Sequence, residues 1–213
     1  MKTALVAGST GLIGNQLIRL LLNDPSYGTV IAISRKALEI QHAKLKVVMA
    51  DLTTLDEYKT QLVADEVYCC LGTTMKVARS KEAFRAVDYD YPLALAKLTY
   101  ASGAKSFALV SSLGANADSF VFYNRVKGEI EKAIDEIGFD RFHIFQPSLL
   151  LGDRTEKRAG EDSAKTAYQF LGFLLPKKYK AIESIKVARA MIHFSHEKVP
   201  GRFIHQSNVL QNF

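Results

Sequence analysis

Residues 8–14 read Gly8-Ser9-Thr10-Gly11-Leu12-Ile13-Gly14, and they join a short apolar run to a segment of helical period. Three glycines at this spacing, between a strand and a helix, are typical of a turn that receives the phosphates of a dinucleotide. We expect Gly8 to permit the sharp turn, Gly11 to let the backbone approach the diphosphate, and Gly14 to let the helix pack closely. The start of the helix would offer its free N–H groups and partial positive charge to the phosphates.

Short β-branched apolar runs alternate with longer segments of helical period along the rest of the chain. We expect strands at residues 3–7, 30–34, 46–49, 66–70, 106–110 and 141–145, with a further strand near 202–205. Helices are expected at 12–23, at 81–102 with a break near Pro92, at 122–137, and near 166–174 and 185–194. This alternation predicts an α/β fold, a doubly wound parallel sheet of the Rossmann type with helices on both faces.

The length and composition fit one domain. A chain of 213 residues with 48% hydrophobic content can bury a sizeable core, and we expect residues 146–213 to add the substrate-side loop and helices to that same domain. Cys69 and Cys70 are adjacent, so we interpret them as small core residues in a reducing compartment. No signal peptide, membrane span or metal site is expected, which predicts a soluble, cytoplasmic protein.

The net charge of +6 raises the question of nucleic acid. Acidic residues interrupt most of the basic ones, so no basic stripe forms along the chain. An ordinary solvated surface and an anionic small ligand explain the charge better, and we expect no nucleic-acid partner.

The residues after the second expected strand bear on the choice between NAD and NADP. NAD-selective sites carry an acidic residue there for the ribose 2′-hydroxyl, whereas this chain has Ser34, Arg35 and Lys36. The guanidinium of Arg35, helped by Lys36 and Ser9, can bind a 2′-phosphate through charge-assisted hydrogen bonds. We therefore expect NADP and consider NAD the less favoured cofactor. The alternative is that Arg35 is an ordinary surface arginine.

A candidate catalytic group follows the fifth expected strand. Tyr123 and Lys127 are separated by one helical turn, so their side chains project from the same face, and Ser111 and Ser112 stand at the carboxyl end of the strand. Tyr123 would give a proton to a carbonyl oxygen during hydride transfer, and the Lys127 ammonium would favour its ionisation and bind the nicotinamide ribose. A hydroxyl, from Ser112 or Ser111, would polarise the same oxygen. The alternative is that Tyr123 packs on a neighbouring helix and Lys127 is solvated.

These motifs occur in an order that resembles the short-chain dehydrogenase/reductase superfamily. The resemblance is to the atypical branch of that superfamily. In chain order, the matching motifs here are Gly8-x-x-Gly11-x-x-Gly14, Asp51-Leu52, Leu71-Gly72-Thr73, Ser111-Ser112 and Tyr123-x-x-x-Lys127. The chain is also similar to the subgroup of Tat-interacting, oxidoreductase-like proteins in four stretches: Cys69 to Thr74, Val126 to Glu129, Phe139 to Arg141 and Leu150 to Arg154.

The resemblance assigns further cofactor contacts. It implies that Asp51 and Leu52 flank the adenine, that Leu71, Gly72 and Thr73 lie along the adenosine ribose, and that Pro147 and Ser148 lie on the nicotinamide side. Without the resemblance, Asp51 is equally well explained as a helix N-cap and Pro147 as a strand terminator.

Two features depart from the catalytic members of the superfamily. Asp88 stands where they carry an asparagine, and the segment after Phe145 is short. The main hypothesis is an NADP-dependent reductase of an unidentified small carbonyl compound. The competing hypothesis is a non-catalytic redox sensor or scaffold, whose protein partner would contact residues 152–163. Neither the substrate nor the oligomeric state follows from the sequence.

Overall fold

A seven-stranded sheet forms the centre of the computed structural model, which describes residues 1–51, 53–151 and 176–213. Its order is β3-β2-β1-β4-β5-β6-β9, and every neighbouring pair is parallel. The strands are β1 (Lys2–Ala7), β2 (Tyr27–Ser34), β3 (Leu45–Met49), β4 (Glu66–Cys69), β5 (Ser106–Val110), β6 (Arg141–Gln146) and β9 (Gly201–Gln206). A separate parallel pair joins β7 (Leu150–Leu151) to β8 (Ile182–Glu183).

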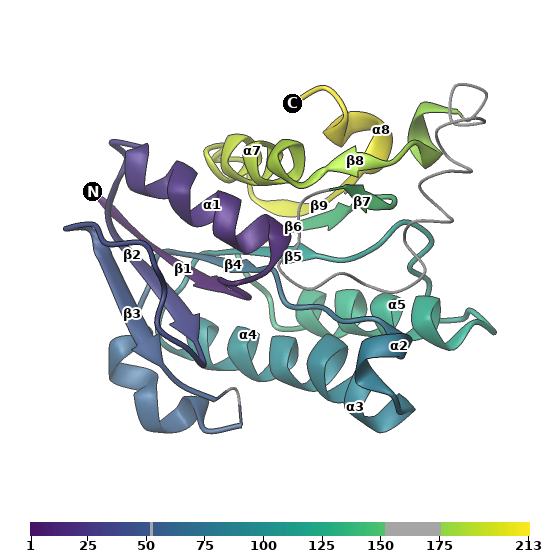
Figure 1. Cartoon of the computed structure of the whole chain (residues 1–213), viewed down its shortest axis with the longest axis horizontal. Coiled ribbons are helices and arrows are strands. Elements are labelled where there is room, and N and C mark those ends of the chain that lie inside the picture. The colour runs from purple at the N-terminus through teal and green to yellow at the C-terminus, as the bar shows by residue number, and fades with distance from the viewer. Residues whose placement is uncertain (52, 152–175) are drawn as a thin grey trace.

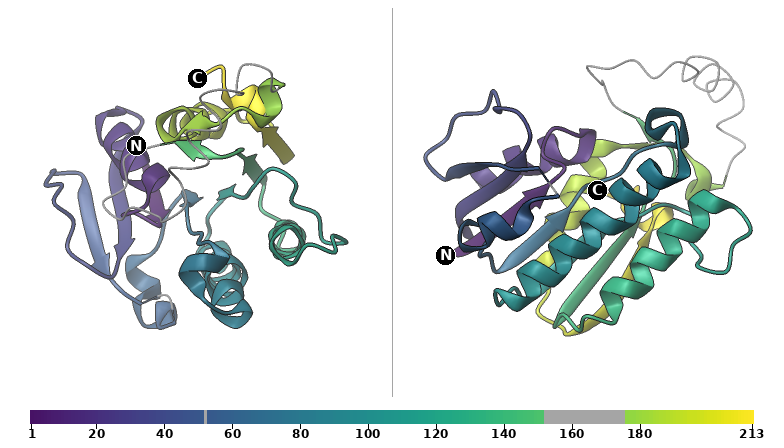
Figure 2. Two further views of the ribbon diagram at one scale, coloured as in Figure 1. Left: turned by 45° about the vertical axis from the view of Figure 1, so that its right-hand side comes forward. Right: turned by 90° about the horizontal axis from the view of Figure 1, so that it is seen from below.

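Helices cover both faces of the sheet (Figure 1). One face carries α1 (Leu12–Asn23), α7 (Ser184–Ser195), α8 (Ser207–Leu210) and η4 (Lys177–Tyr179). The other carries η1 (Leu55–Gln61), α2 (Met75–Ala78), α3 (Lys81–Arg85), η2 (Ala86–Asp90), α4 (Tyr91–Ala101) and α5 (Phe122–Asp135). Seen from below, α4 and α5 run side by side under the strands (Figure 2). The predicted Rossmann-type fold is confirmed.

The core lies in two layers because successive residues of a strand point to opposite faces. In β1, Leu5 and Ala7 pack with the α4 and α5 side, whereas Ala4 and Val6 pack with the α1 and α7 side. Strands buried on both faces carry nearly continuous apolar runs, and this is why the sequence pattern located them. No helix in the described part of the chain is both long enough and apolar enough to cross a bilayer.

The segment 81–102 differs from the expectation of one helix broken near Pro92. The helical segments follow one another without a gap from Lys81 to Ala101, and the irregularity is the π-helical η2 directly before α4, where the Tyr91 N–H donates to the Ala86 carbonyl oxygen five residues back. Asp51 is not a helix N-cap, because that position of η1 belongs to Thr54. Pro147 directly follows β6, as a strand terminator would. The helix expected at 166–174 lies outside the described residues.

Candidate dinucleotide site

Two of the three glycines in the 8–14 turn are required by the protein itself. Gly8 has a φ of +81°, and a Cβ on it would lie 2.6 Å from the carbonyl carbon and oxygen of Cys70. A Cβ on Gly14 would lie 2.2 Å from the Gly8 carbonyl oxygen. Gly14 thus lets α1 approach the turn itself, at the point where β1 ends, and any side chain there would push the helix away.

Gly11 differs from both. Its φ of −75° and ψ of 169° suit any residue, and among the described residues a Cβ there would approach only the Gly8 carbonyl oxygen, at 3.2 Å. The protein's own packing therefore gives little reason for glycine at this position, whereas a diphosphate lying against the backbone would give one. Gly11 is also the N-cap of α1 and makes no side-chain cap hydrogen bond, so it leaves the first N–H groups of the helix to another acceptor, such as a ligand.

The side chains within the turn divide between core and surface. Ile13 is buried among the apolar residues beneath α1, so only its backbone can contribute to a ligand site. Leu12 is half-buried and Thr10 is exposed. The buried Ser9 hydroxyl donates to the Ile33 carbonyl oxygen at 2.7 Å, which ties the turn to the end of β2.

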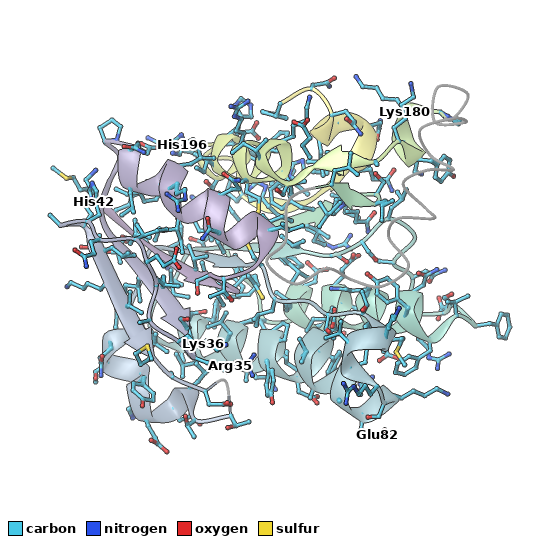
Figure 3. The ribbon with its side chains drawn as sticks, viewed as in Figure 1. Arg35, Lys36, His42, Glu82, Lys180 and His196 are labelled. Atoms are coloured by element: carbon cyan, nitrogen blue, oxygen red, sulfur yellow. The ribbon has the colours of Figure 1, made fainter. Side chains whose placement is uncertain are left out.

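The end of β2 carries two exposed cations. Arg35 and Lys36 lie next to each other there (Figure 3), and the Ser34 hydroxyl donates to the Lys36 carbonyl oxygen at 2.6 Å. Asp51 follows the neighbouring β3, and the pKa of its carboxyl is lowered by hydrogen bonds from Thr53 and by the positive charge of Arg35. The predicted basic residues and Asp51 therefore share one corner of the sheet edge. Leu52 lies outside the described residues.

A buried ion pair lies at the next part of this edge. The Lys127 ammonium nitrogen is 2.7 Å from Asp88 Oδ1, and both side chains are almost fully buried. The other carboxylate oxygen of Asp88 accepts a hydrogen bond from the Thr73 backbone N–H at 2.9 Å. A Cβ on Gly72 would lie 3.6 Å from the Lys127 nitrogen. Leu71, which precedes Gly72, is half-buried against the core. The loop after β4 and the lysine of α5 thus meet at Asp88.

Lys127 is not solvated, contrary to the alternative interpretation of the Tyr-x-x-x-Lys motif. Burial is the largest single influence on the pKa of Lys127 and lowers it, but the electrostatic interactions with Asp88, Tyr123 and Cys69 and the hydrogen bond to Asp88 together outweigh burial and raise that pKa. Tyr123 is half-buried, and its ring packs on Phe84 of α3 with centroids 5.4 Å apart. Part of the Tyr123 ring is therefore used in packing, while its exposed part remains accessible.

The two serines after β5 have different surroundings. Ser111 donates its hydroxyl to the buried carboxyl of Glu131, which also accepts hydrogen bonds from the Gln146 amide at 3.0 and 3.2 Å. Ser112 Oγ is buried and has no partner among the described residues. Burial raises the pKa of Glu131, although its hydrogen bonds act against this. Of the two predicted hydroxyls, that of Ser112 is the one with free hydrogen-bonding capacity.

The residues after β6 connect the site to the C-terminal part of the chain. The Pro147 carbonyl oxygen accepts from the Leu113 N–H at 2.9 Å, which fixes the segment that follows Ser112. Ser148 donates to the Lys180 carbonyl oxygen and contacts the Ser207 hydroxyl at 2.9 Å. The proposed partner-binding segment 152–163 lies outside the described residues.

Comparison with known proteins identifies the family. A family model described as NAD(P)H-binding matches residues 8–197. The chain belongs to this NAD(P)H-binding family. The HTATIP2 protein of Rattus norvegicus is 36% identical over 196 residues, covering 90% of this chain and 80% of its own length. The protein FMP52 of Candida albicans, named mitochondrial, is 32% identical over 208 residues, covering 92% of this chain and 89% of its own. These relatives place the chain in the HTATIP2-like subgroup of atypical short-chain dehydrogenases/reductases.

Solved structures agree with the fold of this NAD(P)H-binding family. The Bordetella bronchiseptica enzyme WbmH in complex with NAD⁺ superposes with a TM-score of 0.72 at 15% identity, covering 97% of this chain and 76% of that one. The likeness concerns the fold. Together with the family match, it supports an NAD(P)-binding, oxidoreductase-like domain.

Glu131, Gln146 and Gly128 are site residues that the sequence analysis missed. Glu131 lies one turn beyond Lys127 on the same face of α5, and an acidic residue on that buried face could have signalled a polar partner. A Cβ on Gly128 would lie 2.1 Å from the Ala117 backbone nitrogen, so the loop before α5 packs directly on the helix. Nothing in the local sequence indicates that contact. In the part of the chain that the structure describes, no cluster of three or more His, Cys, Asp or Glu side chains could hold a metal ion.

Proposed function

We propose that this protein is an NADP-dependent oxidoreductase that reduces a small carbonyl compound. The observation that supports it most is the open Gly11 backbone at the start of α1, on the same sheet edge as Ser112 and Lys127. In open α/β sheets, ligands bind at the carboxyl edge where the strand order reverses, and this chain reverses between β1 and β4.

The preference for NADP rests on the corner formed by Arg35 and Lys36. A 2′-phosphate there would receive charge-assisted hydrogen bonds from the guanidinium, which also offsets the charge of Asp51. A single hydrogen bond to a charged group contributes about 1.5–3 kcal/mol, which corresponds to roughly 10- to 100-fold in affinity.

The test is a parallel titration of the wild type and of Arg35→Ala with NADPH and with NADH. We expect Arg35→Ala to weaken NADPH binding by at least about tenfold and to change NADH binding little. Arg19→Ala is the matched control, because it removes an exposed arginine from α1 and should affect neither. Equal loss for both coenzymes would count against a 2′-phosphate contact, and no binding of either would refute the proposed function.

The chemistry follows from the residues at the nicotinamide side. The bound reduced coenzyme would supply a hydride to the carbonyl carbon. Tyr123 would give its phenolic proton to the carbonyl oxygen as negative charge develops there, and the Lys127 ammonium would stabilise the resulting phenolate. The Ser112 hydroxyl, which has no hydrogen-bond partner among the described residues, would donate a hydrogen bond to the same oxygen.

A second experiment separates turnover from binding. Oxidation of NADPH over a panel of carbonyl compounds should fall at least about a hundredfold in Tyr123→Phe, because general acid catalysis contributes about 10²–10⁴-fold. Tyr100→Phe, which removes a hydroxyl from an exposed tyrosine of α4, should behave as the wild type. Unchanged activity in Tyr123→Phe, for any compound that the wild type reduces, would show that Tyr123 is not the proton donor.

The buried Asp88–Lys127 pair favours a second candidate, a non-catalytic redox sensor or scaffold. A Lys127 ammonium held by Asp88 is less able to stabilise a phenolate than a lysine without a counter-charge. This candidate predicts tight NADPH binding without turnover on the panel, and loss of a partner interaction when the coenzyme is removed. The Candida relative is named as a mitochondrial protein, and the cytoplasmic location of this chain stays a prediction.

A further inference from the structure

Asp88 contacts two segments that are distant from it in the sequence. Its carboxylate lies 2.7 Å from the Lys127 ammonium of α5 and accepts the Thr73 N–H of the loop after β4. It lies in η2, a π-helical segment between α3 and α4, and such segments are frequent at functional sites. A Cβ on Gly72 would lie 3.5 Å from Asp88 Oδ1, so the loop passes directly over the ion pair.

The surroundings of Lys127 make Asp88 its counter-charge. Tyr123 and Glu131 lie one turn away on either side along α5, and Cys69 approaches from β4. The Glu131 carboxyl is occupied by Ser111 and Gln146, and burial raises the pKa of Cys69 to about 12, so its thiol is neutral. The carboxylate in direct contact with the Lys127 ammonium is that of Asp88.

We propose that Asp88 is a positioning residue that holds Lys127 charged and couples it to the Gly72–Thr73 loop, so that Lys127 and the loop contact a bound dinucleotide together. The inference rests on the proposed function for the identity of the ligand. An asparagine at this position would keep one contact, either to Thr73 or to Lys127, and would remove the counter-charge. Lys127 would then lie buried without the carboxylate that contacts it, and burial favours the neutral amine.

The first test compares the pH dependence of NADPH affinity in three proteins. We expect the wild type to bind with an affinity that changes less than about twofold between pH 6 and pH 9, since its Lys127 stays charged. In Asp88→Asn, affinity should fall at least about fivefold across the same range, because the neutral amine makes the weaker hydrogen bond. Asp90→Asn, the same change at an exposed position of η2, should follow the wild type. Restoration of the flat profile by Asp88→Glu would support the role of the charge.

Identical pH profiles in Asp88→Asn and the wild type would overturn the inference and leave the proposed function standing. If the wild type binds neither coenzyme, the proposed function is refuted, and a second measurement then tests whether Asp88 keeps Lys127 charged. Nuclear magnetic resonance of the lysine side-chain carbons, with Lys127 assigned through Lys127→Arg, needs only the folded wild type. The Lys127 resonance should show no titration below about pH 10, and a titration midpoint under about pH 9 would contradict the role of Asp88.

Discussion

Alanine substitutions at Gly11 and Gly14 should have opposite effects on folding and on ligand binding. At Gly14 the new Cβ would lie 2.2 Å from the Gly8 carbonyl oxygen and 2.8 Å from its carbon, so α1 must move by about 1 Å. Overpacking of this kind destabilises a protein by about 1–3 kcal/mol or more. Alanine is favoured over glycine within a helix by roughly 1 kcal/mol, and this gain offsets only part of that cost. We expect Gly14→Ala to lower the free energy of unfolding by at least about 1 kcal/mol.

At Gly11 the same substitution is nearly neutral for folding. The new Cβ would lie 3.2 Å from the Gly8 carbonyl oxygen, its one close contact with the part of the chain that the structure describes, and relieving it needs a shift of a few tenths of an ångström. The loss of a favourable N-cap residue costs about 1 kcal/mol, and the reduced freedom of the unfolded chain offsets about 0.4–1 kcal/mol of that. The methyl group would, however, stand where the diphosphate approaches. Displacing one or two charge-assisted hydrogen bonds, at about 1.5–3 kcal/mol each, weakens binding by at least tenfold.

Urea unfolding and NADPH fluorescence titration of the two variants measure both quantities. The expected pattern is a stable Gly11→Ala that has lost most of its affinity and a Gly14→Ala that is less stable. A Gly11→Ala protein with wild-type affinity would refute the reasoning, because no phosphate could then lie against that backbone. A Gly11→Ala protein as unstable as Gly14→Ala would show that the glycine serves folding.

Three further predictions concern buried groups. Cys69 is fully buried and burial raises its pKa to about 12, so a thiol reagent at neutral pH should not label Cys69 until the protein is unfolded; rapid labelling of Cys69 in the native protein would contradict this. Burial lowers the pKa of His143 and His205 to about 4, so the unfolded chain gains protons between about pH 6.5 and 4 while the folded chain does not. The free energy of unfolding should therefore fall by up to about 4 kcal/mol from pH 7 to pH 5, measured by urea unfolding, and a resonance assigned to His143 or His205 that titrates near pH 6.5 in the folded protein would contradict it. Glu131→Ala should cost about 2–4 kcal/mol of stability in the same assay, because it leaves buried polar partners unsatisfied, and Glu131→Gln should cost less; equal stabilities would show that this network contributes little.

The sequence predicted the sheet and the glycine turn because both depend on local patterns. Buried parallel strands need apolar side chains on both faces, and a tight strand-to-helix turn needs glycine at Gly8. The Asp88–Lys127 contact and the hydrogen bond of Ser111 to Glu131 join elements that only the tertiary fold brings together. Asp88 was recognisable as a departure from the family pattern. The contacts that it makes could not be predicted, because helix propensity does not predict the π-helical segment in which it lies.

The charges along the carboxyl edge of the sheet serve two different tasks. Arg35 and Lys36 are exposed at one end of it, where a cation can attract a phosphate and where dissolved salt screens the attraction. At the other end the charge of Lys127 is buried and matched by Asp88, so it contributes little to long-range attraction. An anionic ligand is therefore drawn to the β2 corner, and orientation near Ser112 depends on short hydrogen bonds. Under the proposed function, this division would let one edge bind a highly charged dinucleotide while contact geometry near Tyr123 controls proton transfer to a carbonyl oxygen.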